Sequence, residues 1–297
     1  MSGAFMNKQD IESAISAATG ATFQIDSQSH VGGGDINTAM KINGTDNKDY
    51  FIKLNSANLL DMFEAEAAGL RDMATANAVR VPKPICTGVT ESQAFIVIEY
   101  LDLGGRGSMS DFAKQLVQMH RSSNDRFGWH RDNTIGSTPQ INAWTNEWLD
   151  FWAEHRLGYQ LDLAARRGIS SSALAKGEAL QTRLSDFFSG YQPEPSLLHG
   201  DLWSGNYGFL RSGEPVIFDP ATYYGDREAD LAMTELFGGF GGDFYAAYNA
   251  SWPLDEGYAV RKTLYNTYHI LNHFNMFGGG YGSQAESMMA RCLAEVS

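Results

Sequence analysis

The chain has 297 residues, of which 43% are hydrophobic, so it can bury a core large enough for two lobes and is not mainly disordered. Its formal net charge of −13 argues against a nucleic-acid partner, and it suits either an amine-bearing substrate or simple solubility. The two cysteines, Cys86 and Cys292, predict no disulfide framework. The first 20 residues lack an apolar signal core, and no run reaches the ~18 apolar residues of a membrane span. We therefore expect a cytoplasmic protein without a membrane partner.

The first hundred residues predict a small lobe made of a sheet and helices. Residues 8–19 have the apolar spacing of a short amphipathic helix, and residues 58–76 have helical periodicity as well. Extended segments separated by turns rich in glycine and asparagine are expected at 22–31, 37–42, 50–54 and 94–98. Pro82 and Pro84 exclude a helix just before the last of these strands. The sheet should be mainly antiparallel.

The glycines at 104–107 predict a flexible connection, and the chain beyond them is mostly helical. Helical segments are expected at 110–121, 144–167, 172–189, 227–236, 242–249 and 257–276, interrupted by a loop and strand pair at 197–219. These patterns predict an α+β fold with two lobes. The smaller lobe would cover residues 1–101 and the larger, mainly helical lobe 102–297, with a hinge at about 99–107.

The most informative segment combines two carboxylates and an amide. Asp201 and Asn206 lie five residues apart in a loop that contains glycine, and Asp219 ends a short apolar run. Phosphoryl transfer from a nucleotide uses an acidic group to orient the attacking hydroxyl, and an Asn and an Asp to hold Mg²⁺ on the phosphates. A few hard oxygen ligands suit a magnesium ion that keeps water and phosphate as its other ligands. The spacing therefore predicts a kinase that uses ATP and Mg²⁺, with Asp201 as the catalytic residue.

Each residue of this segment also has an ordinary structural interpretation. Asp201 could cap a helix or a turn, Asn206 could be a turn residue, and Asp219 could simply end a strand. Their combination favours catalysis for Asp201 and metal binding for Asn206 and Asp219. We expect His199 to be structural, with hydrogen bonds to backbone groups, because this is the commoner situation for a buried histidine.

Lys53 lies near the end of the third expected strand. In the protein-kinase pattern a lysine at this place reaches the nucleotide phosphates and pairs with a glutamate on the following helix. Glu66 is the expected partner and Glu64 the competitor, since residues two apart do not share a helix face. The alternative for Lys53 is a surface lysine at the edge of a strand.

Gly32-Gly33-Gly34 would let the first hairpin approach the triphosphate and donate backbone N–H groups to it. Three glycines are more often an ordinary loop, and only their position one strand before the strand of Lys53 gives them weight. They do not form a Walker loop, because no Gly-Lys-Ser/Thr sequence follows.

Several runs are more specific than these spacings. They are His199-Gly200-Asp201-Leu202-Trp203-Ser204-Gly205-Asn206, the run Phe218–Met233, Leu236-Phe237-Gly238-Gly239-Phe240, Gly32–Asn37, Phe63–Glu66 and Val81–Pro84. Through them most of the chain resembles the fructosamine kinase, or ketosamine-3-kinase, family, which has a protein-kinase-like and aminoglycoside-phosphotransferase-like fold. Trp203 and the Tyr-Tyr-Gly-Asp and Phe-Gly-Gly-Phe runs point to this narrower family.

The resemblance implies a kinase that phosphorylates a ketosamine. The acceptor would be a glycated amine that is either small or attached to a protein lysine. Phosphorylation at the sugar 3-hydroxyl would destabilise the ketosamine and release the amine, which is a repair chemistry. The lobe 1–101 would then bind the nucleotide, with the Glu99 carbonyl and the Leu101 amide at the adenine edge. The lobe 102–297 would supply catalysis and the substrate site.

Three further residues are candidates for this site. Trp203 and Tyr224 could line the sugar site, since aromatic faces pack on sugar rings and can meet a cationic amine, although core packing is nearly as good an interpretation. Asp230 opens an expected helix and would accept backbone N–H groups of the Asp201 loop, which would hold the loop rigid.

Two alternatives stay open. A neighbouring small-molecule phosphotransferase would act on an aminoglycoside, a choline-like or a hydroxy-amino substrate, and Trp203 and the Phe-Gly-Gly-Phe run argue against it. A catalytically inactive member of the family would only bind nucleotide or a partner. Loss of a key residue would signal this, but all four are present: Lys53, Asp201, Asn206 and Asp219. The sequence distinguishes neither a free from a protein-bound acceptor nor one oligomeric state from another.

Overall fold

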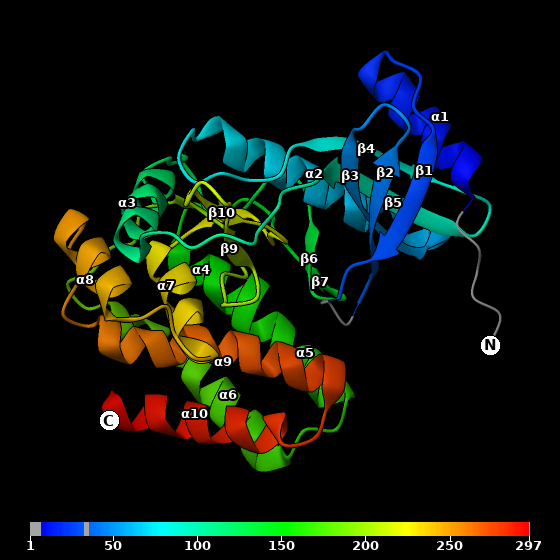
Figure 1. Cartoon of the computed structure of the whole chain (residues 1–297). Helices are drawn as coiled ribbons and strands as arrows, with labels where there is room; N and C mark the ends of the chain where they lie inside the picture. Colours follow the sequence, from blue (N-terminus) through cyan, green and yellow to red (C-terminus); the bar gives the residue numbers. More distant parts are fainter. Residues whose placement is uncertain (1–6, 33–35, 297) are drawn as a thin grey trace. The chain divides into compact units, whose positions relative to one another are not determined.

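The computed structural model describes residues 7–32 and 36–296, and the chain divides into two compact units (Figure 1). The first unit comprises Met1–Gly107 together with Gly208–Phe218. The second comprises Ser108–Tyr207 together with Asp219–Ser297. The chain thus enters the first unit twice. No helix of the described residues is long and apolar enough to cross a membrane.

The first unit contains a five-stranded antiparallel sheet in the order β1-β2-β3-β5-β4. Its elements are α1 (Lys8–Thr19), β1 (Ile25–His30), β2 (Thr38–Gly44), β3 (Asp49–Ser56), the 3₁₀ turn η1 (Ala57–Leu59), α2 (Leu60–Thr75), β4 (Pro84–Val89) and β5 (Gln93–Glu99). The expected antiparallel sheet is confirmed. Strand β4 was not expected, because prolines open it. A proline is tolerated there since it is the first residue of a strand at the edge of the sheet.

Side chains alternate between the two faces of this sheet. Ile52 and Leu54 of β3 belong to a buried cluster that also contains Ile11 and Ile15 of α1. Lys53, between them, points to the opposite face, where it reaches Glu66 of α2. One strand therefore supplies core contacts on one side and a charged group on the other.

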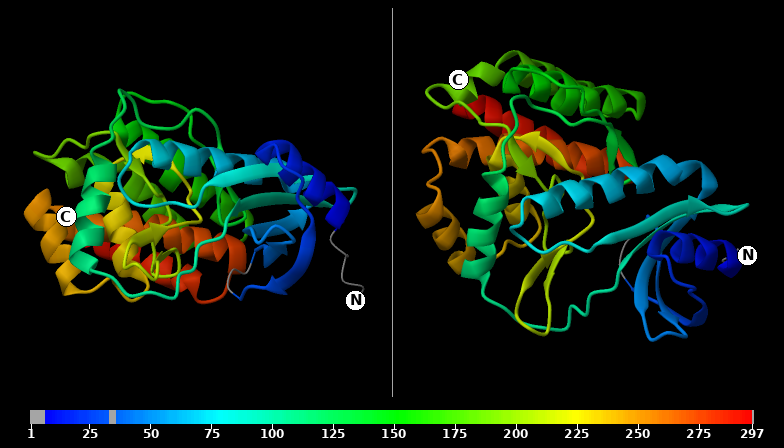
Figure 2. Two further views of the ribbon diagram at one scale, coloured as in Figure 1. Left: turned by 45° about the horizontal axis from the view of Figure 1, so that its top comes forward. Right: turned by 90° about the horizontal axis from the view of Figure 1, so that it is seen from above.

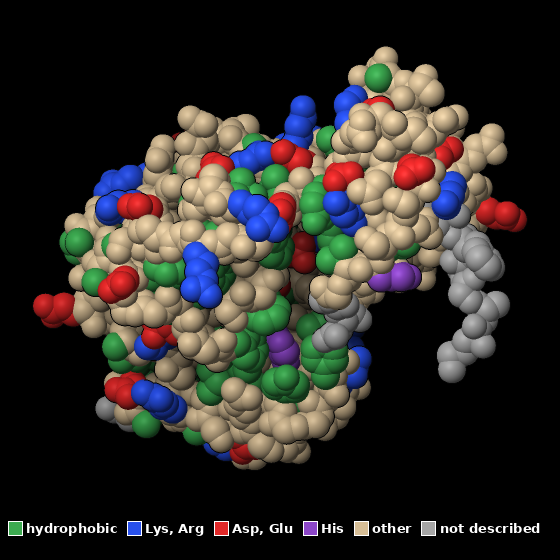
Figure 3. All heavy atoms as spheres, viewed as in Figure 1, with side chains coloured by type: hydrophobic (Ala, Val, Ile, Leu, Met, Phe, Trp, Pro, Cys, Tyr) green, Lys and Arg blue, Asp and Glu red, His purple; other side chains and the backbone are tan. Residues whose placement is uncertain are grey.

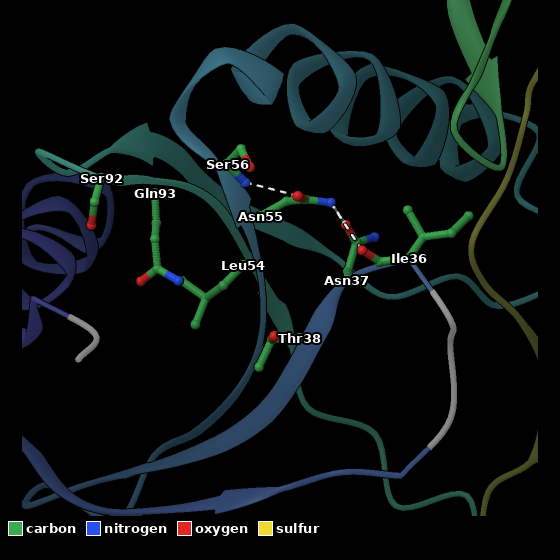
Figure 4. A pocket seen from close by; sticks show the side chains of 8 residues that line it. All are labelled: Ile36, Asn37, Thr38, Leu54, Asn55, Ser56, Ser92 and Gln93. Carbon is green, nitrogen blue, oxygen red and sulfur yellow. Dashed lines mark hydrogen bonds between the residues drawn. The ribbon is translucent and has the colours of Figure 1, made fainter. Parts of the chain in front are cut away.

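A pocket of about 410 Å³ lies on the first unit where β2 begins, β3 ends and β5 begins (Figure 4). Asn55 donates from its side-chain amide to the Ile36 carbonyl and to Asn37 Oδ1 at its rim. None of the residues that line it is a site residue expected from the sequence.

The connection at 104–107 is packed rather than free. Strands β9 (Tyr207–Phe209) and β10 (Pro215–Ile217) form a two-stranded sheet, and Gly105 N–H donates to the Phe209 carbonyl at 3.0 Å. A Cβ on Gly105 would lie 1.8 Å from the Leu210 carbonyl oxygen. The glycine is needed for this close approach.

The second unit is mainly helical, as expected. Its helices are α3 (Met109–His120), α4 (Trp148–Phe151), the π-helix η2 (Trp152–Gly158), α5 (Tyr159–Arg166), α6 (Ser171–Thr182), the 3₁₀ helix η3 (Leu184–Phe188), α7 (Arg227–Leu236), α8 (Gly242–Ser251), α9 (Tyr258–Phe277) and α10 (Tyr281–Glu295). Its strand pairs are β6 (Asn133–Ile135) with β7 (Thr138–Gln140), and β8 (Ser196–Leu198) with β11 (Tyr223–Gly225).

Helix α10 was missed by the sequence analysis. It lies beside α9 and α6 (Figure 2). Its buried residues are Ala285, Met289 and Cys292, which recur at the spacing of one helix face. The signal was therefore present in the sequence, directly after the glycines that end α9.

Candidate active site

The pairing of β8 with β11 brings two loops together. Leu198 of β8 is opposite Tyr223 of β11, so the residues that follow β8 adjoin those that precede β11. Ala221 N–H donates to the His199 carbonyl at 2.8 Å and joins the two loops directly. Asp201 lies on the first loop and Asp219 on the second. Two carboxylates that are 18 residues apart in sequence thereby lie on adjoining loops.

Gly200 is required by this arrangement. Its φ is +82°, and a Cβ there would lie 2.0 Å from the Ala221 carbonyl oxygen. Any larger residue would push the two loops apart. The glycine of the His-Gly-Asp run therefore has a steric explanation.

Asp201 is surrounded by groups that disfavour its charge. Burial and then the negative charge of Asp219, with a smaller effect of Asp230, raise the pKa of Asp201 to about 7, although a hydrogen bond from Asn206 lowers it. A carboxyl group with a pKa near neutrality can accept a proton and later return it, as general acid–base catalysis requires.

Asn206 is held inside the loop. Its side-chain nitrogen donates to the Asp201 carbonyl at 2.8 Å and to Asp201 Oδ2 at 3.3 Å, and its backbone N–H donates to the Trp203 carbonyl. Because the nitrogen is used within the loop, the side-chain oxygen is the atom with which Asn206 can ligate a cation.

Asp219 has an unusual backbone. Its φ is +58°, in the left-handed region that residues other than glycine seldom adopt. Such a conformation persists only where the surroundings hold it, and it is found preferentially at functional sites. Strand β10 ends two residues earlier, so the simple interpretation of Asp219 as the end of a strand does not account for this conformation.

Asp230 of α7 binds the backbone of the loop that contains Asp201. Its two carboxylate oxygens accept the backbone N–H groups of His199 at 2.7 Å and Gly200 at 2.8 Å. His120 Nε2 lies 3.1 Å from Asp230 Oδ2, and its Nδ1 lies 2.7 Å from the Tyr248 hydroxyl. Burial alone would raise the pKa of Asp230, but the hydrogen bond and electrostatic interaction with His120, then the electrostatic interaction with His199 and the Gly200 N–H, lower it.

His120 is a residue of this site that sequence reasoning missed. It is the last residue of α3 and is fully buried. The sequence offers only a histidine at the end of an amphipathic helix, and nothing local to it indicates a partner more than a hundred residues away. His199, in contrast, lies in the loop itself, where its Nδ1 is 3.2 Å from Asp201 N.

In the first unit, Lys53 Nζ donates to Glu66 Oε1 at 2.7 Å, and only 7% and 11% of these side chains are exposed. Glu64 is exposed to solvent on another face of α2. Such a protected ion pair fixes the lysine in one orientation, which a surface lysine would not have.

The remaining expected residues of the first unit are Glu99, Leu101 and the glycines 32–34. Glu99 ends β5, and its carboxylate accepts from Arg80 at 2.6 Å. Leu101 follows it and is half-buried, while Gly32 is exposed. Gly33 and Gly34 lie outside the described residues.

Trp203 begins a chain of aromatic contacts in the second unit. Its side chain is 37% exposed, and its ring centroid lies 6.2 Å from that of Phe237. Phe237 lies 5.1 Å from His273, which lies 5.8 Å from Phe277 and 5.1 Å from Tyr281. Figure 3 shows hydrophobic side chains gathered around a histidine over α9. We call Trp203, Phe237, His273, Phe277 and Tyr281 the aromatic strip.

Tyr224 has a different setting. It lies on β11, where its backbone N–H donates to the Gly128 carbonyl at 2.8 Å. Its ring centroid is 6.2 Å from that of Trp144. Among the two aromatic candidates, Trp203 is therefore the one whose ring joins the aromatic strip.

The sequence profile described as fructosamine kinase matches residues 7–295. A probable ketoamine kinase from Synechocystis is 49% identical over 96% of both chains. The chloroplastic protein-ribulosamine 3-kinase of Oryza sativa subsp. japonica is 44% identical over 91% of this chain and 80% of its own.

Solved structures agree with these matches. A candidate fructosamine-3-kinase from Haemophilus somnus has a TM-score of 0.88 at 30% identity and covers 95% of this chain and 96% of its own. A choline kinase from Streptococcus pneumoniae, at 16% identity and a TM-score of 0.59, covers 97% of this chain and 98% of its own and shares the fold alone. The expected kinase-like fold and the resemblance stated above are confirmed, and the chain belongs to the fructosamine kinase family.

Proposed function

We propose that this protein transfers the γ-phosphoryl group of ATP to the 3-hydroxyl of a ketosamine and so starts the release of the glycated amine. Family membership supports the kinase chemistry and ATP use. The observation that carries the assignment of residues is the pairing of β8 with β11, which joins the Asp201 and Asp219 loops in one site. We propose residues 1–101 as the nucleotide-binding lobe and 102–297 as the catalytic and substrate lobe.

In this proposal Asp201 accepts a hydrogen bond from the sugar hydroxyl and takes its proton. The sugar oxygen forms a bond to the γ-phosphorus while the bond from that phosphorus to the bridging oxygen breaks, and ADP leaves. The pKa of about 7 places Asp201 close to the ideal value for such a base near neutral pH. Asp230 and Gly200 keep the carboxylate in place.

The residues of the site fit a magnesium ion. Burial and, after it, the negative charge of Asp219 raise the pKa of Asp201, and a bound cation would relieve the repulsion between the two carboxylates. Asp219 and the side-chain oxygen of Asn206 would hold the ion, and both are the hard oxygen donors that Mg²⁺ prefers. When bound, the ion would neutralise charge on the phosphates.

Lys53 would position the nucleotide phosphates, held by Glu66. Backbone groups of Glu99 and Leu101 would bind the adenine edge, and Gly32-Gly33-Gly34 would lie near the phosphates. These assignments come from the family pattern and from the orientation of Lys53. They make the first unit the source of nucleotide affinity.

Trp203 would contact the sugar or its amine, since it is exposed in the same loop as Asp201 and an aromatic face suits both. Tyr224 is a second candidate for the sugar site. The names of the plant relatives support acceptors that are attached to proteins. We therefore propose that a ketosamine on a protein lysine is accepted as well as a small one.

The test is ATP turnover by the purified protein with a fructosyl- or ribulosyl-lysine analogue, a glycated peptide, an aminoglycoside and choline. We expect turnover with the ketosamines, a phosphate on O3 by NMR, and none with an Asp201→Asn variant. Turnover with the aminoglycoside or choline alone would favour the neighbouring phosphotransferases. Equal rates for the wild type and the variant with every acceptor would exclude an enzyme of this kind.

A further inference from the structure

The loop that contains Asp219 is held on its far side by buried amides. Gln140 of β7 donates from Nε2 to the Ala221 carbonyl at 3.1 Å, and Asn133 of β6 donates from Nδ2 to the Thr222 carbonyl at 2.8 Å. Gln140 is 1% and Asn133 8% exposed. Two successive carbonyls directly after Asp219-Pro220 are thus fixed by two side chains of one hairpin.

These amides are themselves fully engaged. Gln140 Nε2 also donates to Asn133 Oδ1 at 2.8 Å, and Gln140 Oε1 accepts from the Tyr268 hydroxyl at 2.7 Å. Asn142 donates to the same Asn133 oxygen at 2.9 Å, and its own oxygen accepts from the buried Arg156 at 2.7 Å. We call Asn133, Gln140 and Asn142 the amide network. A fully satisfied buried network of this kind is rigid, because every partner fixes the next.

Ala221 is the point at which the network meets the site. Its N–H donates to His199, its carbonyl accepts from Gln140, and that carbonyl packs against Gly200. Asp219 lies two residues before it with a φ of +58°. This left-handed backbone needs surroundings that hold it, and the carbonyls next to it are where the structure holds it.

We propose that Gln140 and Asn133 are positioning residues that orient Asp219 toward the metal ion. This inference rests on the proposed function, in which Asp219 is a metal ligand. Neither residue touches the reacting atoms, so each acts through the backbone that follows Asp219. Without Gln140, Asp219 would remain in the loop, but its side chain could adopt other orientations. Partners that orient a metal ligand typically contribute about 10- to 100-fold in metal affinity.

The test measures binding rather than turnover. The Kd of a non-hydrolysable ATP analogue is determined by calorimetry in EDTA and again in Mg²⁺, and the ratio of the two isolates what the metal contributes. We expect Gln140→Leu to reduce this ratio about tenfold while the Kd in EDTA stays within about twofold of the wild type. In turnover assays, the Mg²⁺ concentration at half-maximal rate should rise and the KM for the ketosamine should not.

Gln160→Leu is the matched control. Gln160 is also fully buried in the second unit and bonds to other amides, Asn272 at 3.2 Å and Asn275 at 2.7 Å. It also meets the Tyr268 hydroxyl but makes no bond to the Asp219 loop. It should lose a similar amount of thermal stability and keep the wild-type ratio. Asn133→Ala, which removes the bond to Thr222, is a second test of the inference should Gln140→Leu fail to fold.

Asp219→Ala separates the two levels of the proposal. If it abolishes the effect of Mg²⁺ on analogue binding while folded Gln140→Leu and Asn133→Ala retain it, the positioning role is wrong and the metal site stands. If Asp219→Ala itself binds the analogue with the full metal effect, the metal assignment in the proposed function fails. If Gln140→Leu and Gln160→Leu reduce the ratio equally, the effect is general loss of packing and the inference is overturned.

Discussion

The loops of Asp201 and Asp219 and the pair Lys53–Glu66 are held in different ways. Each loop in the second unit is fixed by several buried hydrogen bonds and has a backbone conformation that needs support, at Gly200 and at Asp219. Lys53 lies on a regular strand, and its ion pair with Glu66 orients it. Where the proposed bond-making takes place, the structure specifies backbone geometry. In the proposed nucleotide-binding region, the structure fixes the position of a charged side chain, Lys53.

This difference predicts that substitutions in the two loops damage catalysis more than substitutions at Lys53 do. The largest effect should come from Asp219→Ala, which removes a proposed metal ligand. We expect a loss of several kcal/mol of transition-state stabilisation, measured as kcat/KM in saturating Mg²⁺. If this variant kept its activity in Mg²⁺, Asp219 would not be a metal ligand. The proposed difference between the two loops and Lys53 would then lose its main support.

Asp201→Asn should follow closely. The amide keeps the shape of the side chain but cannot accept the proton, and such a base contributes about 10²- to 10⁴-fold to rate. The loss should appear in kcat, while analogue binding measured by calorimetry stays near the wild-type value. A variant that loses analogue binding instead would mean that Asp201 serves nucleotide binding, as Lys53 does.

Asp230→Asn should reduce kcat less than Asp201→Asn does. It should also lower the thermal stability of the protein. One oxygen of the carboxylate would be replaced by an NH₂ group that cannot accept both backbone N–H groups, and a hydrogen bond to a charged group is worth about 1.5–3 kcal/mol. Thermal denaturation and kcat are the measurements. A full loss of stability with unchanged kcat in the folded fraction would show that the loop does not need this support for catalysis.

Lys53→Met should chiefly raise the Kd of the ATP analogue, with a smaller fall in kcat at saturating ATP. Removing one partner also leaves Glu66 buried without its charge partner, so some stability should be lost. Lys114→Met, which breaks an exposed ion pair with Asp111, is the control and should change neither quantity. A loss in kcat as large as that of Asp201→Asn would remove the distinction between the two regions.

The smallest effect concerns pH. The pKa of Asp201 rises from an ordinary value near 3.8 to about 7 in the folded protein, so its contribution to stability is fully present below about pH 3.8 and is lost as the pH rises through about 7. Asp201→Asn should therefore gain thermal stability relative to the wild type at pH 8, by on the order of 1–3 kcal/mol, and less at pH 5. Equal pH profiles would show that the carboxyl is not strained by its surroundings.

The sequence predicted those features whose signals are local. The strand of Lys53, the helix of Glu66 and the spacing of Asp201 and Asn206 all follow from residues close in sequence. His120 and Gln140 could not be found in this way, since their partners Asp230 and Ala221 are 110 and 81 residues away. An isolated histidine or glutamine looks like any other polar residue until a tertiary contact desolvates it. The left-handed backbone of Asp219 is likewise a product of its surroundings.

The hairpin at 208–218 has a consequence for how this protein is made. It completes the first unit through bridges from Phe209 to Gly104 and from Val216 to Arg80, although the chain has by then passed through a hundred residues of the second unit. During synthesis from the N-terminus, the first unit cannot acquire these contacts until residue 218 has left the ribosome. A fragment cut at Gly107 would expose the surface on which the hairpin packs. Expression of the first unit alone should therefore require residues 208–218 to be joined to it, for example through a short linker after Gly107.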